Sequence, residues 1–436
     1  METLFKILCT IDPSFTQDWS DLLRRSTEDD SSIEETVRAV IQEVRARGDQ
    51  AVLEYTERFD EHRPASLEVS AQEVSQAAKS VPKETLNALK TAAERIKDFH
   101  QRQRKKSAGS WLDRKSGTLL GERILPLERV GIYVPGGLAA YPSTVLMTAI
   151  PAQIAGVKEI IMVSPWRDGF SNPQTLAAAK LAGVTRIFKI GGAQAIAALA
   201  YGTETIPAVD KIVGPGNAYV AAAKRLVFGK AGIDMIAGPT EIIVIADERA
   251  NPEHVAADLL SQAEHDPLAV PILLTHSEKL IPSVHEALER QLMGLQRREI
   301  LAKSIVGRGV AVRTKNLVES IRLSNQFAPE HLSLQIRNAE KTLPKIRNAG
   351  AIFLGPLSPV AFGDYIAGPN HVLPTSGTAR FSSPLGVGDF LKRSSVIGMN
   401  EKAFEKLAPT VIRLAEIEGL TAHAASVQIR LKRNPV

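Results

Sequence analysis

Cysteine is almost absent from this chain: Cys9 is the only one among its 436 residues. A single cysteine excludes an internal disulfide framework, and it excludes a zinc site built from several thiolates. This usage fits a reducing compartment, so we expect a cytoplasmic protein. The first 15 residues also lack the charged start, long apolar stretch and small-residue cleavage site of a secretory leader.

Long hydrophobic runs are missing as well. No apolar stretch free of charge reaches the roughly 18 residues that a membrane span needs, so we expect no membrane partner. Aromatic residues make up only 5% of the chain, and the basic clusters at 102–106 and 430–433 contain none. A net charge of +5 without interleaved aromatic residues favours solvated helix ends and small anionic ligands. We therefore expect no nucleic-acid partner.

The remaining composition, 44% hydrophobic and 23% charged, is ordinary for a globular protein, and the length favours two or more domains. Residues 1–28 are polar and are expected to form an extension. A helical pattern begins at Ser32 and runs to Lys106, and its apolar residues between 86 and 99 share one helix face.

From Arg129 onward, short apolar segments alternate with helical ones in two series. This alternation predicts β-α-β units and parallel sheets, and the uninterrupted apolar strands indicate sheets covered on both faces. After about Leu385 the pattern returns to polar helices. The strands expected in the first series span 130–134, 159–163, 186–190 and 211–213, and those in the second span 242–245, 270–274, 310–313, 331–336 and 351–354.

Three glycine-rich turns, 135–137, 191–194 and 214–217, each follow an expected strand and precede a helix. Glycine lets a ligand approach the backbone, and a helix N-terminus offers free N–H groups. None of the turns has the G-x-G-x-x-G pattern, and an ordinary turn explains any one of them. Together, at one edge of a sheet, they favour a nucleotide crevice. Gln194 and Asn217 open their helices, either as caps or as ligand contacts.

Two further groups of polar residues could bind a metal or act as general bases. Gln262 and His265 end a helix three positions apart and so share a face, although a helix dipole alone also favours a histidine there. Glu330 and His331 stand together before a strand and offer two general bases of different pKa, or simply an exposed polar start of that strand. Because H-E-x-x-H and C-x-x-C are both absent, a zinc site has to be assembled from distant segments.

Several segments, taken in order, resemble the histidinol dehydrogenase family. Each is short, but their joint spacing is specific, and the resemblance spans about residues 30 to 425. In this chain Thr240 stands where serine is common in the family, and Phe327 stands where tyrosine is common. The matching segments are 214–217, 234–241, 258–267, 329–331 and 368–374.

The resemblance implies specific roles for residues of this chain. It implies one Zn²⁺ per subunit, held by Gln262, His265, Asp364 and His423. It implies NAD contacts by Tyr133, Gln194 and Asn217. It implies contacts to the substrate L-histidinol by Thr240, Gln262, His265, His331, Asp364, His371, Glu418 and His423, with Glu330 and His331 as the paired bases.

The implied reaction is a four-electron, NAD-dependent oxidation of L-histidinol through L-histidinal to L-histidine, in histidine biosynthesis. The implied fold is α/β, with two doubly wound, Rossmann-like parallel-sheet modules and short helical extensions at both ends. We expect a first domain of 29–129 with 240–385, which carries the catalytic and zinc residues, and a second, NAD-binding domain of 130–239. The tail 386–436 is expected to supply residues to the partner subunit of a homodimer.

Other functions remain open at the level of sequence. A zinc hydrolase could use Glu330 as its base, with the glycine turns merely structural. A related dehydrogenase could act on another amino alcohol or on a sulfonate alcohol. A non-catalytic protein that binds a nucleotide or a metal would turn over no amino alcohol at all.

Overall fold

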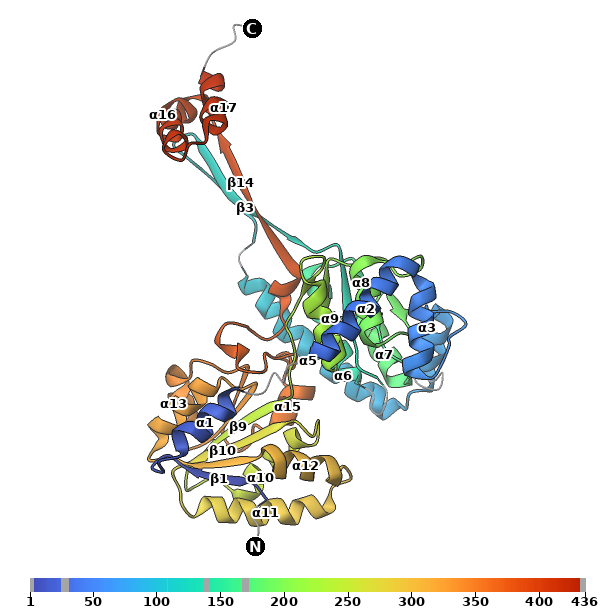
Figure 1. Ribbon diagram of the computed structural model, residues 1–436, viewed down its shortest axis with the longest axis vertical. Coiled ribbons are helices and arrows are strands. Elements are labelled where there is room, and N and C mark those ends of the chain that lie inside the picture. Colours follow the sequence, from blue (N-terminus) through green and yellow to red (C-terminus); the bar gives the residue numbers. More distant parts are fainter. Residues whose placement is uncertain (1–3, 25–30, 108, 137–140, 167–171, 432–436) are drawn as a thin grey trace. The chain divides into compact units, whose positions relative to one another are not determined.

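A computed structural model describes residues 4–24, 31–107, 109–136, 141–166 and 172–431 (Figure 1). Gly137, part of one expected glycine turn, lies outside these ranges. The chain divides into two compact units, which we describe separately. The first unit comprises Met1–Arg104 with Leu127–Phe390, and the second comprises Lys105–Pro126 with Leu391–Val436. In the described part of the chain, no helix is both long and apolar enough to span a membrane.

The first unit contains a five-stranded parallel sheet in the order β6-β5-β4-β7-β8. The first strand of the series, β4, is central, and the chain builds outward on one side before it returns to the other. Such a reversal creates a crevice at the carboxyl ends of the two strands that flank it, here β4 and β7. The strands are β4 (Arg129–Tyr133), β5 (Glu159–Val163), β6 (Arg186–Phe188), β7 (Lys211–Val213) and β8 (Gly232–Ile233).

Small, apolar helices cover this sheet. Nearly every residue of α8 is buried, because alanine side chains let the helix approach the strands closely. The left-handed residues Gly156 and Gly183 end α6 and α7, where a side chain would strain the backbone. The helices that follow the strands are α6 (Pro142–Ala155), α7 (Pro173–Ala182), α8 (Gly192–Tyr201) and α9 (Ala218–Val227).

Helices α2 (Ser31–Arg47) and α3 (Asp49–Asp60) also pack against this sheet, beside α8 and α9 (Figure 1). Their buried residues, among them Val37, Val44 and Val52, share a core with Ile161 of β5. We expected residues 29–129 to accompany the second series of strands instead. The apolar stripe of a helix predicts that one face is buried, but it does not indicate which sheet buries it. The chain continues through α4 (Ala71–Ser80) and α5 (Lys83–Lys106).

The second series forms a six-stranded parallel sheet in the order β1-β11-β10-β9-β12-β13. Its edge strand β1 comes from the segment that we expected to be only an extension, and α1 packs Phe15 and Trp19 beneath the same sheet. Together the two sheets confirm the two parallel α/β modules. The strands are β1 (Lys6–Cys9), β9 (Glu241–Ala246), β10 (Val270–Thr275), β11 (Val310–Arg313), β12 (His331–Gln335) and β13 (Ala351–Leu354).

Helices cover both faces of the six-stranded sheet and bury one apolar cluster on each. Helix α12 was not anticipated from the sequence. The helices of this module are α1 (Phe15–Arg24), α10 (Pro252–Ala263), α11 (Leu280–Gly294), α12 (Arg298–Arg308), α13 (Leu317–Phe327), α14 (Ala339–Thr342) and α15 (Val360–Tyr365).

The second unit is a three-stranded antiparallel sheet in the order β14-β3-β2, which continues into two helices (Figure 1). We expected the C-terminal tail to be helical, and α16 and α17 are, but β14 precedes them. In β3 and β14 apolar residues are mixed with charged ones, and few of their side chains are buried. The elements are β2 (Trp111–Lys115), β3 (Thr118–Pro126), β14 (Leu391–Met399), α16 (Glu401–Ile417) and α17 (Thr421–Leu431).

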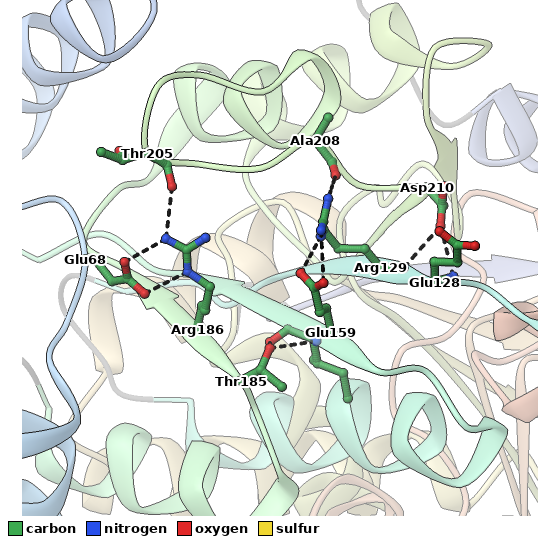
Figure 2. Close-up of polar contacts among 10 residues, drawn as sticks. Glu68, Glu128, Arg129, Glu159, Thr185, Arg186, Thr205, Ala208 and Asp210 are labelled. Carbon is green, nitrogen blue, oxygen red and sulfur yellow. Dashed lines mark hydrogen bonds and ion pairs between the residues drawn. The ribbon is translucent and has the colours of Figure 1, made fainter.

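Ion pairs lie at the amino ends of β4, β5 and β6 (Figure 2). Arg129 and Glu159, the first residues of β4 and β5, form a double hydrogen bond of 2.6 and 3.0 Å. Arg186, the first residue of β6, binds Glu68 in the same way at 2.8 and 2.7 Å. These pairs lie at the amino ends of the strands, whereas the predicted crevice lies at the carboxyl ends.

The substitution Glu159→Gln tests how much the ion pair between Arg129 and Glu159 contributes to stability. The hydrogen bond from Arg129 lowers the pKa of Glu159 below its ordinary value of 4.5. The contribution is therefore present above that value and is lost as the pH falls through the lowered, folded-state pKa. Because both side chains are about one third to one half exposed, we expect a loss of at most about 1 kcal/mol.

Thermal unfolding, followed by circular dichroism at neutral and acidic pH, measures this effect. The Tm of Glu159→Gln should be lower than that of the wild type at neutral pH, and the gap should close in acid. Glu57→Gln, which removes the more exposed pair with Arg63, is the control and should change the Tm less. A difference in Tm that widens in acid would contradict a stabilising role for the Arg129–Glu159 ion pair.

Candidate active site

One cavity of about 1380 Å³ lies within the first unit, lined by residues of both modules. A pocket for one small ligand has roughly 300–1,000 Å³, so this cavity has room for more than one. Glu418 and His423 belong to the second unit, at the end of α16 and in the first turn of α17, and both are exposed. The predicted residues that line the cavity are Tyr133, Gln194, Asn217, Thr240, Gln262, His265, Glu330, His331, Asp364 and His371.

The two modules contribute opposite edges of their sheets. Tyr133 ends β4, and Gly214 follows β7, so the five-stranded sheet presents its carboxyl edge. Glu330 and His331 stand at the start of β12, beside the start of β9, so the six-stranded sheet presents its amino edge. Doubly wound sheets usually bind ligands at the carboxyl edge. That rule predicts the part of the cavity at the five-stranded sheet, but it does not predict the part at the amino edge of the six-stranded sheet.

Glu330 is a buried carboxylate held by two donors. Its Oε2 accepts from the backbone N–H of Glu241 at 2.9 Å and lies 2.6 Å from the hydroxyl of Thr240. Before it, Ala328 ends α13 in the left-handed conformation, and Pro329 follows. This irregular turn lets Glu330 and its neighbour His331 both line the cavity, although adjacent residues of a regular strand point to opposite faces.

His331 is buried with its ring fixed by backbone. Its Nδ1 lies 3.0 Å from the carbonyl oxygen of Glu241. A carbonyl can only accept, so Nδ1 carries the proton, and Nε2 presents a lone pair in the neutral ring. Nε2 is buried without a hydrogen-bond partner among the described residues, 3.7 Å from the Asp364 carboxylate.

Charge and burial act on His331 in opposite directions. Burial lowers the pKa of the imidazole, but the negative charges of Glu330 and Asp364 outweigh it and raise the pKa to about 10. For Asp364, burial raises the pKa of the carboxyl group, whereas His331 and then His371 and His265 lower it, and the net direction is down. The site therefore favours a charged carboxylate beside an imidazolium unless another cation is present.

The orientation of the Gln262 side-chain amide follows from the donors and acceptors around Thr240. Thr240 Oγ1 lies 2.9 Å from the side-chain oxygen assigned to Gln262 and 2.6 Å from Glu330 Oε2. A hydroxyl has one proton, and the ionised carboxylate can only accept it. Thr240 must therefore accept from Gln262, which turns the amide nitrogen of Gln262 toward it. The amide oxygen then takes the position of the buried atom that has no partner among the described residues.

The remaining residues at this edge are His265 and His371. His265 follows the end of α10 and is exposed, with its N–H 3.2 Å from the carbonyl of Gln262. His371 donates from Nδ1 to the Asp364 carbonyl at 2.9 Å, and its Nε2 lies 3.4 Å from the hydroxyl of Thr144. Burial lowers the pKa of His371, which favours the neutral ring.

These donors fit a zinc ion. Gln262, His265 and Asp364 offer two oxygens and one nitrogen around the cavity, a mixture that suits zinc. Within the described residues, the amide atom of Gln262 that is buried without a hydrogen-bond partner supports this fit. No three histidine, cysteine, aspartate or glutamate side chains in the described ranges lie close enough together to hold a metal by themselves, so the set includes the Gln262 amide. The fourth predicted ligand, His423, belongs to the second unit.

The carboxyl edge of the five-stranded sheet carries the predicted nucleotide contacts. The Tyr133 hydroxyl accepts from the N–H of Gly192 at 3.1 Å, and burial raises the pKa of Tyr133 to about 12. Gln194 is fully buried, and both polar atoms of its amide lack partners among the described residues. Asn217 caps α9 by accepting from Val220 N at 3.1 Å. Asn217 therefore caps the helix through Oδ1, and Gln194 has both polar atoms of its amide available for a ligand.

Several cavity residues were not anticipated from the sequence. Several of them come from α2 and α3, which we had assigned to the other module, so that only the correct packing of these helices could have pointed to them. The buried ion pair of Lys224 with Asp234 was also missed, because nothing in the sequence pairs these two residues. The additional lining residues include Thr36, Tyr55, Arg58, Asp60, Thr144 and Arg297.

Known proteins resemble this chain over nearly its full length. A profile of the histidinol dehydrogenase family matches residues 23–431. The chain is 52% identical over 431 residues to histidinol dehydrogenase from Geobacter metallireducens, covering 98% of both chains. It is 54% identical over 431 residues to the enzyme from Acinetobacter baylyi, covering 98% and 100% of the two chains. Its fold matches the crystal structure of histidinol dehydrogenase from Elizabethkingia anophelis with a TM-score of 0.92 and 38% identity, over 99% of each chain.

Thr240→Val tests the orientation deduced for Gln262. Valine keeps the shape but neither donates to Glu330 nor accepts from Gln262, so we expect a loss of about 1–3 kcal/mol in unfolding free energy. Because the amide of Gln262 would no longer be oriented, the affinity for Zn²⁺ should fall roughly 10- to 100-fold. Urea unfolding and calorimetric Zn²⁺ titration measure the two effects. Thr240→Ser retains the hydroxyl and is the control; equal behaviour of the two variants would refute the deduction.

Proposed function

This chain belongs to the histidinol dehydrogenase family, and we propose that it oxidises L-histidinol through L-histidinal to L-histidine with Zn²⁺ and two molecules of NAD. The principal support is the pair of buried bases, Glu330 and His331, in the same cavity as the nucleotide edge of a doubly wound sheet. Proton acceptors and a nucleotide crevice are what an alcohol oxidation requires.

Gln262, His265 and Asp364 would hold zinc together with His423 of the partner subunit. Bound zinc supplies positive charge that orients the amino alcohol and offsets the Asp364 carboxylate, which otherwise raises the pKa of His331. Tyr133, Gln194 and Asn217 would bind NAD, which accepts the hydride in each oxidation. The buried amide of Gln194, whose polar atoms lack partners among the described residues, supports this assignment.

Each of the two bases, His331 and Glu330, has one atom available to accept a proton. His331 keeps its Nδ1 proton on the Glu241 carbonyl, so its Nε2 takes the proton of the substrate hydroxyl as the alcohol is oxidised. Both contacts to Glu330 engage Oε2, which leaves Oε1 to take a proton from the water that adds to the aldehyde. His331 returns its first proton from Nε2 to the aldehyde oxygen as the hydrate forms, and the neutral ring then takes the hydroxyl proton of the hydrate in the second oxidation. Enclosure of the aldehyde in the cavity limits its side reactions.

An assay of the purified protein with Zn²⁺, NAD and L-histidinol tests the proposal. Absorbance should show two NADH formed for each L-histidinol consumed, with L-histidine as the product. A different amino alcohol or a sulfonate alcohol that reacts faster would move the enzyme to a related substrate class. Hydrolysis of an added ester or amide without NAD reduction would support a zinc hydrolase instead.

Glu330→Gln should separate the two half-reactions. The amide cannot take a proton from water, so oxidation of L-histidinal should slow far more than oxidation of L-histidinol to the aldehyde. A positioned general base contributes about 10²- to 10⁴-fold. Stopped-flow measurement of NADH formation from each substrate gives the two rates. His331→Asn is the comparison and should slow both, whereas equal slowing by Glu330→Gln would remove its assigned role.

The second unit supports a homodimer. Its buried apolar residues are few and mostly alanines, such as Ala403, Ala408 and Ala415. In contrast, Leu407, Val411 and Leu414 recur at helical spacing on α16 and are exposed by 39%, 44% and 56%. An apolar stripe of this kind is usually covered by another surface. A second copy of the chain would cover it, and exchange of the tails would bring Glu418 and His423 to the partner's active site.

Mixed dimers test the shared site. His423→Ala and Asp364→Ala should each be inactive, because each removes a zinc ligand from every site. After subunit exchange, a mixed dimer should contain one site with both defects and one with neither. Activity should therefore recover to a fraction of the wild-type value. Verified mixed dimers that stay inactive, while wild-type dimers survive the same exchange, would show that His423 serves its own chain.

A further inference from the structure

A buried ion pair lies beneath the nucleotide edge of the five-stranded sheet. The side chains of Lys224, in α9, and Asp234, just after β8, are only 2% and 1% exposed, and they contact each other directly. The cost of removing two charges from water can exceed the attraction between them, so such a pair is weak evidence for stability alone. The position of the pair calls for another explanation.

Both partners also bind the same backbone residue. Asp234 Oδ2 accepts from the N–H of Gly214 at 2.7 Å, and Lys224 Nζ donates to the carbonyl of Gly214 at 3.0 Å. Asp234 Oδ1 accepts in addition from the N–H of Met235 at 2.7 Å. The pair therefore fixes both polar groups of Gly214.

Gly214 needs this support because of its conformation. Its φ is +113°, and a Cβ atom would lie 2.2 Å from the carbonyl oxygen of Tyr133, so only glycine fits. The residue opens the turn between β7 and α9 at the strand reversal, and the turn ends at Asn217, which caps α9. Residues 214–217 and Asp234 all line the cavity. Lys224 reaches the turn from below without lining the cavity.

We propose that Lys224 and Asp234 are positioning residues for the dinucleotide: they fix Gly214, and through it the turn 214–217, in the conformation that binds the cofactor. This inference rests on the proposed NAD dependence. A preformed turn at a helix N-terminus presents its N–H groups to an anionic ligand without an ordering cost at the moment of binding. Without the ion pair, Gly214 retains its glycine freedom, and the turn becomes one conformation among several.

NADH binding to the Zn²⁺-loaded protein, followed by fluorescence, tests the proposal without relying on turnover. Lys224→Met and the isosteric Asp234→Asn should each raise the Kd for NADH about tenfold or more, as expected when hydrogen bonds to a charged group are lost. Affinity for Zn²⁺ should change little. Glu159→Gln is the matched control, since it breaks an ion pair at the opposite edge of the same sheet (Figure 2) and should leave the Kd unchanged.

The double variant Lys224→Met with Asp234→Leu separates positioning from simple stabilisation. Replacement of a buried ion pair by apolar side chains often restores or increases stability. The Tm should therefore recover relative to Lys224→Met, while NADH binding stays weak. Recovery of both would overturn the proposal, as would single variants that lose Tm but bind NADH normally. A wild-type protein that does not bind NADH would overturn the proposed NAD dependence as well, an outcome distinct from failure at this pair alone.

Discussion

The backbone of one residue, Glu241, determines the geometry of both candidate bases. Its N–H donates to Glu330, and its carbonyl accepts from His331. Glu241 opens β9, and its neighbour Ile242 is in register with His331 of β12. At the amino end of a parallel strand the first peptide groups lack a complete set of ladder partners, so they are available to side chains. The site thus depends on the register of two neighbouring strands, which the surrounding core keeps rigid.

Contacts between backbone and side chain also determine the geometry on the other side of the cavity, but there the side chains hold the backbone. At the amino edge of the six-stranded sheet, backbone groups hold charged and polar side chains. At the carboxyl edge of the five-stranded sheet, the charged side chains of Lys224 and Asp234 hold the backbone of Gly214. In both places a fixed peptide group connects the sheet to a functional segment. The segment from Asp234 to Glu241 joins the two, because it runs from one sheet to the other.

Much of the fold could be predicted from the sequence, for identifiable reasons. The strands at 159–163, 211–213 and 310–313 have the expected bounds, because strands buried on both faces are short, uninterrupted apolar runs. The partly exposed edge strand at 351–354 also has them, since it too is a continuous apolar run. Strands β3 and β14 were missed because few of their side chains are buried and charged residues interrupt their apolar pattern. The packing of α2 and the pairing of Lys224 with Asp234 depend on tertiary structure. The family resemblance pointed to ten of the cavity residues, but not to the amino-edge location or the Gln262 orientation.

The hydrogen-bond pattern around Thr240 explains why an amide stands at position 262. The side chain there has to donate toward Thr240, whose only proton is engaged by Glu330. In the proposed zinc site it would also present an oxygen on its other side. Glutamine meets both demands at once. A glutamate of the same length would bring two acceptors together and add a further negative charge next to two carboxylates, whereas a histidine would differ in reach. The amide at position 262 is thus selected by its neighbour Thr240, and any change at one of these two positions constrains what the other can be.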